Sequence, residues 1–157
     1  KKDFRDIYSS PMSQGTRCHQ LATYIVFDSP LVMLCDAPTA YRKEPECTRF
    51  IAGLPVVADE TRILQGKMGE YIVTARRVGE DWIAGGLTDW EARTVDLDLS
   101  FLPEGMFRAE IFCDGINADK KGEDYRHEYR DVKREDRLKM QLAPGGGFAI
   151  RLKKNHN

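Results

Sequence analysis

The sequence predicts a mainly β protein in which an antiparallel β-sandwich follows a helical segment. Apolar residues recur at helical spacing within residues 1–55, whereas from residue 56 to residue 152 they alternate with polar residues. Turn residues divide the second part into seven or eight short runs, a spacing typical of an antiparallel sandwich. We therefore expect a helical segment over 1–55 and a sandwich domain over 56–157.

Three helices are expected in the helical segment. The first follows residues 13–16 and places Leu21 and Ile25 on its apolar face. A second, short helix is expected over 29–34, because a serine suited to the N-cap precedes a proline at the first helical position. A third is expected over 45–53, from a proline at its start to a glycine at its end.

Alternating apolar and polar residues predict the strands of the sandwich. Residues 71–77 and 82–87 flank a turn and are expected to form a hairpin. Further strands are expected at 94–99, 107–113, 138–142 and 148–152. The segment 117–139 carries many charges of both signs, and only Tyr125, Tyr129 and Val132 are candidates to point inward. We interpret this segment as a solvated edge hairpin rather than a binding patch.

Charge and hydropathy exclude several classes of protein. The chain has 157 residues, with 24 Lys and Arg against 25 Asp and Glu, and 41% of its residues are hydrophobic. This composition excludes a disordered tail, and the balanced charge makes nucleic acid a poor candidate partner. No stretch approaches the roughly 20 apolar residues of a membrane span, so no membrane partner is expected. The chain opens with Lys1 rather than Met, as a piece of a longer protein would.

The four cysteines are expected to be buried free thiols. Cys18, Cys35, Cys47 and Cys113 do not have the spacing of a zinc or redox motif. Free cysteines commonly pack as small hydrophobic residues. One disulfide is the alternative if the protein is exported.

Few titratable residues form a pattern that supports catalysis. His19 adjoins Cys18, but neighbouring helical residues point in different directions, so we expect a packed or capping histidine. His127 and His156 lack neighbours with metal-ligand spacing. Asp59 and Glu60 alternate across a strand, which favours salt bridges to Arg62, Arg76 or Arg77 over acid–base chemistry.

Three further features are candidates for a binding site. Residues 114–119 resemble a calcium loop only faintly, because Ile116 stands where a ligand oxygen is needed, so a turn is expected. Of the two tryptophans, Trp82 is expected in the core, whereas Trp90 follows a strand end and is the candidate to stack on a sugar ring. The glycines at 145–147 lack the Lys-Ser/Thr of a phosphate loop and predict a tight turn.

An ordered set of stretches resembles the C-terminal region of glycoside hydrolase family 97, the α-glucosidases and α-galactosidases typical of gut Bacteroidetes. Besides Trp82, the stretches are 13–22 (SQGTRCHQLA), 27–31, 35–38, 50–55, 59–64, 69–77, 85–86, 114–118 and 143–147. The resemblance covers nearly the whole chain, from about Pro11 to Leu152. One departure is Ala58, where the family usually has Trp.

The resemblance implies that residues 1–55 are the last helices of a catalytic (β/α)8 barrel and that 56–157 form the C-terminal β-sandwich. It also implies that the catalytic carboxylates and the calcium-binding glutamates lie upstream, so no catalytic or metal-binding residue is assigned to this chain. Calcium is expected in the parent enzyme, and the periplasm is the implied location.

The leading hypothesis is a non-catalytic structural domain of an α-glycosidase, with the catalytic barrel of the parent enzyme as its partner. Separation from the barrel would expose an apolar helix face, so self-association of the fragment, or disorder near residues 1–15, is expected. The alternative is a carbohydrate-binding module that holds oligosaccharide at Trp90. A third reading, a small hydrolase, needs two converging carboxylates, for which the sequence offers no strong pair.

Overall fold

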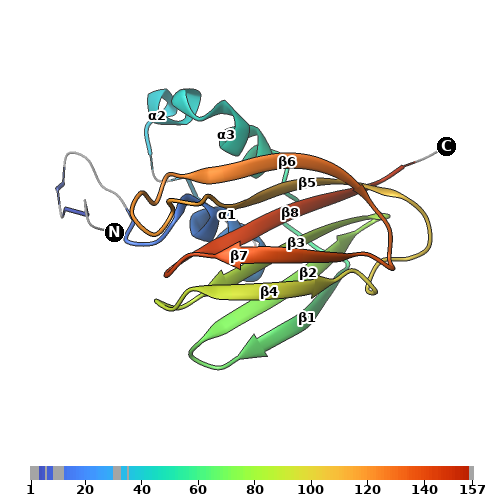
Figure 1. The fold of residues 1–157 in the computed structure, drawn as a ribbon. Coiled ribbons are helices and arrows are strands. Elements are labelled where there is room, and N and C mark those ends of the chain that lie inside the picture. The colour runs from blue at the N-terminus through green and yellow to red at the C-terminus, as the bar shows by residue number, and fades with distance from the viewer. Residues whose placement is uncertain (1–3, 6, 9–12, 30–32, 35, 156–157) are drawn as a thin grey trace.

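The computed structural model describes residues 4–5, 7–8, 13–29, 33–34 and 36–155, and it confirms a mainly β fold. A six-stranded antiparallel sheet packs against a two-stranded sheet, and helices cover the other face of the larger sheet (Figure 1). The prediction of an antiparallel sandwich preceded by helices is therefore confirmed.

Two of the three expected helices are present. Helix α1 spans Arg17–Val26, with the Thr16 hydroxyl accepting a hydrogen bond from the backbone N–H of His19. Helix α3 spans Pro45–Ala52 and ends at Gly53, as expected. The helix expected over 29–34 is not supported at Met33 and Leu34, which are not helical, and the positions 30–32 lie outside the described residues.

Helix α2 was not predicted from the sequence. It spans Pro38–Lys43, and Pro38 occupies the first helical position instead of ending a preceding helix. The pattern Asp36-Ala37-Pro38 fits both interpretations, because proline is tolerated in the first turn of a helix as well as beyond its end.

Six of the eight strands confirm the alternating runs predicted from the sequence, whereas the strand Glu60–Lys67 was not delimited and Tyr125–Val132 lies in the charged segment 117–139. Their bounds are β1 Glu60–Lys67, β2 Tyr71–Val78, β3 Asp81–Thr88, β4 Arg93–Asp98, β5 Phe107–Asp114, β6 Tyr125–Val132, β7 Arg137–Leu142 and β8 Gly147–Lys154. The larger sheet has the order β1-β2-β3-β8-β5-β6, and the smaller sheet pairs β4 with β7. The hairpin predicted at 71–87 is β2–β3.

The charged segment 117–139 lies at a sheet edge as expected, but it is not a hairpin. Strand β6 pairs with β5 at the edge of the six-stranded sheet, whereas β7 pairs with β4 in the other sheet. Of the inward candidates, Val132 is buried in the sandwich core, while Tyr129 is 55% exposed. The hairpin prediction was wrong because the two strands join different sheets, which local alternation does not reveal.

Two apolar layers cover opposite faces of the six-stranded sheet. The first lies between the sheets and includes Trp82, whose core position was predicted. The second lies between the helices and the sheet, and comprises Cys18, Leu21, Ile25, Cys47, Phe50, Ile83, Phe112 and Ala149. The middle of the larger sheet is therefore buried on both faces.

Glycine at position 85 lets α1 lie directly on β3. A Cβ atom added there would lie 3.0 Å from the Cβ of Ile25 and 3.4 Å from the backbone oxygen of Ala22. The apolar face of α1 is consequently buried against the sandwich. Separation from a catalytic barrel would therefore not expose the apolar face of α1, and this face does not account for the expected self-association of the fragment.

Candidate interface site

An open cavity of about 790 Å³ lies between the three helices and residues 120–123 of the β5–β6 connection. Its walls combine tyrosines with charges of both signs, including Tyr24, Tyr41, Arg17 and Glu44. Arg17 Nη1 lies 3.0 Å from Glu44 Oε1, so an ion pair connects α1 to the start of α3. Aromatic and arginine side chains around a shallow cavity are typical of protein–protein interfaces.

A polar network holds α3 against the sheet. The ring of His127 on β6 stacks on Phe112, with a distance of 4.0 Å between ring centroids. Its Nδ1 lies 3.3 Å from Glu46 Oε2 on α3, and its Nε2 lies 3.2 Å from Glu110 Oε1 on β5. His127, for which the sequence showed no neighbours with metal-ligand spacing, thus bridges a helix and a strand.

Glu110 is the centre of this network. Arg151 donates to Glu110 Oε2 through both Nε and Nη2, and the Tyr129 hydroxyl donates to Oε1 over 3.0 Å. Burial by itself would raise the pKa of Glu110, but the hydrogen bonds and charge of Arg151 outweigh it, with help from Tyr129 and His127. The pKa of Glu110 therefore lies below its ordinary value of 4.5.

Replacement of this carboxylate should destabilise the domain in a pH-dependent way. Because folding lowers the pKa of Glu110, the stabilisation is present above the unfolded value near 4.5 and is lost as the pH falls through the folded value. Glu110→Gln should lower the free energy of unfolding by about 2 kcal/mol at pH 7 and by progressively less below pH 4.5. Urea denaturation across this pH range tests the expectation. Glu128→Gln is the control, because that half-buried carboxylate pairs with Arg126 and lies outside the network of Glu110. An equal loss of stability at every pH in Glu110→Gln would contradict the prediction.

Three buried cysteines are free thiols, as predicted. Burial raises the pKa of Cys18, Cys47 and Cys113, so each thiol is protonated and a poor nucleophile at neutral pH. Cys35 lies outside the described residues. Burial, together with Cys47 and Glu46, likewise raises the pKa of Tyr125, whose hydroxyl donates to Glu46 Oε2.

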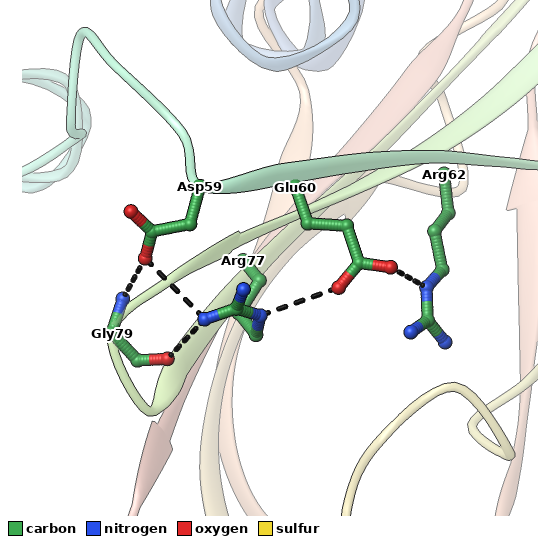
Figure 2. A network of polar contacts seen from close by, with 5 residues as sticks. All are labelled: Asp59, Glu60, Arg62, Arg77 and Gly79. Atoms are coloured by element: carbon green, nitrogen blue, oxygen red, sulfur yellow. Dashed lines mark hydrogen bonds and ion pairs between the residues drawn. The ribbon is translucent and has the colours of Figure 1, made fainter.

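Asp59 and Glu60 form the salt bridges expected of them (Figure 2). Glu60 lies between Arg62, with Nε 2.6 Å from Oε1, and Arg77, with Nε 3.3 Å from Oε2. Asp59 Oδ2 accepts the backbone N–H of Gly79 over 2.7 Å and an N–H of Arg77. Hydrogen bonds from Arg62 and then Arg77 lower the pKa of Glu60. Both carboxylates thus tie the start of β1 to the β2–β3 turn.

Removal of this carboxylate pair should leave the stability of the domain nearly unchanged. The double variant Asp59→Asn/Glu60→Gln removes salt bridges between solvent-accessible side chains, and an amide oxygen can still accept the N–H of Gly79. Its unfolding midpoint in a urea titration should therefore stay close to that of the wild type. A loss above about 1 kcal/mol would show that these salt bridges hold β1 in place.

The Asp114 carboxylate organises the loops at one end of the sandwich. Its Oδ2 accepts the backbone N–H groups of Ala143 and Gly147 over 2.9 and 3.1 Å, and the N–H of Asn117 bonds to Asp124. The predicted turn is present, with the N–H of Ala118 donating to the backbone oxygen of Gly115 over 3.1 Å, but these bonds of the Asp114 carboxylate go to the β7–β8 loop rather than to its own turn. Within the described ranges, no group of three or more His, Cys, Asp or Glu side chains is placed to hold a metal ion.

Trp90 lies at the same end, in the β3–β4 loop, and is 59% exposed. Its ring packs on Gly145 of the β7–β8 turn, where a Cβ atom would lie 2.5 Å from Trp90 Cζ3. Gly145 has a φ of +62°, which favours glycine. His19 is packed as expected, with Nδ1 3.2 Å from the backbone oxygen of Gly146. His156 lies outside the described residues.

Comparison with known proteins decides the family. A model described as the C-terminal, oligomerisation region of glycosyl hydrolase 97 matches residues 57–153. The chain belongs to glycoside hydrolase family 97. It is the C-terminal, non-catalytic domain of the family's α-glycosidases, as the sequence resemblance indicated. In the part of the chain that the structure describes, no helix is long and apolar enough to span a bilayer.

The relatives of this family 97 domain are much longer proteins. It is 55% identical to the retaining alpha-galactosidase of Bacteroides thetaiotaomicron over 98% of the chain and 23% of that protein. It is 30% identical to a probable retaining alpha-galactosidase of Streptomyces bingchenggensis over 83% of the chain and 19% of that protein. A family 97 enzyme from Pseudoalteromonas sp. strain K8, solved in complex with acarbose, superposes with a TM-score of 0.88 at 38% identity, covering 91% of the chain and 23% of that structure. The chain thus spans about a quarter of its relatives' length.

Proposed function

We propose that this domain is the structural C-terminal part of a retaining α-galactosidase, and that its helical side braces a catalytic (β/α)8 barrel. The carrying observation is the 55% identity to a retaining alpha-galactosidase over 98% of the chain. The domain itself would contribute no catalytic carboxylate, because its paired acids are held in salt bridges.

The geometry supports a bracing role for the helices. The inner faces of α1 and α3 are buried on the sheet, so these two helices form a fixed platform. The cavity between them is open to the outside and lined by aromatic and charged side chains. A rigid platform with such a surface can hold a neighbouring domain without a large conformational change.

We further propose an oligomeric state, a calcium site and a cellular location for the parent enzyme. Self-association of that enzyme through this domain is supported by the family description, which names oligomerisation. Calcium would be bound by glutamates of the catalytic part and would serve the reaction there. A periplasmic location is proposed from the family resemblance alone.

The test is an assay of the full-length enzyme with and without this domain. The complete enzyme should hydrolyse an aryl α-galactoside faster than the matching α-glucoside, with retention of the anomeric configuration. An enzyme truncated before residue 13 should lose thermal stability and shift to a smaller species in light scattering. Faster hydrolysis of the glucoside would contradict the proposed α-galactosidase activity. Unchanged stability of the truncated enzyme would contradict the bracing role of this domain.

A further inference from the structure

Trp90 is an exposed aromatic side chain held in a fixed position. Its ring contacts Gly145, whose positive φ and missing Cβ permit the close approach. Gly145 N–H donates to the backbone oxygen of Asp89, so both sides of this contact are anchored. A tryptophan that is ordered before binding loses little side-chain entropy when it is buried by a partner.

The same loops adjoin the start of α1, where the polypeptide enters the domain. The backbone N–H of Thr16 donates to the oxygen of Gly145 over 2.9 Å, and that of Arg17 donates to Gly122 over 2.7 Å. Gly15 and Gly122 also line the cavity between the helices. The β3–β4 and β7–β8 loops lie on the side of the molecule where α1 begins, and β8 runs away from it (Figure 1).

The relatives are about four times as long, and the matched family region is the C-terminal one, so the rest of their chain lies upstream and joins the domain on the side of α1. We propose that Trp90 anchors the domain to the upstream catalytic part of the parent enzyme by inserting into an apolar pocket there. This inference rests on the proposed function and deepens it. Tryptophan is the residue type most enriched among interface anchors.

The surroundings of Trp90 favour a protein partner over a sugar. A sugar platform needs polar groups that are available to bind hydroxyls. Arg93 instead lies between Glu70 and Asp89, with its Nη2 3.4 and 3.7 Å from their carboxylates, and its guanidinium covers the ring of Tyr71. Asp89 Oδ1 also accepts the backbone N–H of Glu91. These polar groups already bond to one another, so the exposed indole ring of Trp90 is the main group at this end that can contact a partner.

The test uses the full-length enzyme with Trp90→Ala, Trp90→Phe and a matched control. Met106→Ala removes a similarly exposed apolar side chain, 48% exposed, next to the opposite end of β8. Hydrogen exchange of the 88–92 and 143–147 loops is followed together with calorimetric unfolding. In Trp90→Ala, exchange at these loops should be at least tenfold faster and the domain should unfold separately from the catalytic part. Trp90→Phe should restore part of the coupling, and Met106→Ala should match the wild type.

Three other outcomes would overturn the anchor. Unchanged exchange in Trp90→Ala, in an enzyme that still hydrolyses galactosides, would refute the anchor while sparing the proposed function. A raised KM for melibiose with unchanged domain coupling would instead support a sugar platform. If Trp90→Ala converted an oligomeric enzyme to a monomer while the domain still unfolded together with the catalytic part, Trp90 would belong to contacts between copies of the enzyme. An inactive wild-type enzyme would refute the proposed function independently of Trp90.

Discussion

Truncation of Phe112 to alanine is expected to lower the free energy of unfolding by about 3–5 kcal/mol and to release α3 from the sheet. Phe112 is fully buried, and its ring centroid lies 4.9 Å from that of Phe50 on α3. The same ring supports His127 by stacking, so its loss also removes one wall of the network around Glu110. The apolar contact and the polar bridge between α3 and the sheet should therefore weaken together.

Urea denaturation measures the size of this loss, and hydrogen exchange locates it. The amides of α3 should exchange faster than those of β3 and β8 in Phe112→Ala. Phe27→Ala is the control, because that ring is 60% exposed and its removal should change stability by less than about 0.5 kcal/mol. A loss below about 1 kcal/mol in Phe112→Ala would show that α3 is held by other contacts.

Substitution of Gly85 by valine is expected to lower the free energy of unfolding by about 3 kcal/mol by forcing α1 away from β3. The added Cβ would lie 3.0 and 3.2 Å from the Cβ and Cγ2 of Ile25, closer than ordinary van der Waals contact. The clash lies in the last turn of α1, whereas the Thr16–Gly145 hydrogen bond holds only the first turn of the helix on the β7–β8 loop. The clash is therefore relieved by displacing the last turn of the helix.

A double-mutant cycle with Ile25→Ala separates this clash from a general loss of strand stability. Ile25→Ala alone should destabilise the domain by about 2–5 kcal/mol, because the side chain is fully buried. The combined variant should lose somewhat less than the two single changes together, since Ile25→Ala removes the clashing Cγ2 atom at 3.2 Å while keeping the Cβ. Strict additivity would contradict direct contact between α1 and Gly85. Gly85→Ala should have a smaller effect than Gly85→Val.

The candidate site could be predicted from the sequence only in part. The salt bridges of Asp59 and Glu60 were predicted because their arginine partners lie on the same strand or on the next strand along the chain, and the exposure of Trp90 because it follows a strand end. The network around Glu110 was missed, because its members come from one helix and three strands. The alternation of Tyr125, His127 and Tyr129 along β6 was the available signal, since it places three rings on one face.

The sequence by itself determined the fold class, the start of α1, both ends of α3, six of the strands and the family. Each of these depends on local periodicity, on capping residues or on short motifs, which can be recognised without knowing the contact partners. The tertiary structure alone decided that β6 and β7 join different sheets, that α1 buries its apolar face on Gly85, and that Trp90 is fixed by Gly145. These features depend on contacts between distant residues, and an alternating pattern shows that a strand has an inner face but not which strand it pairs with.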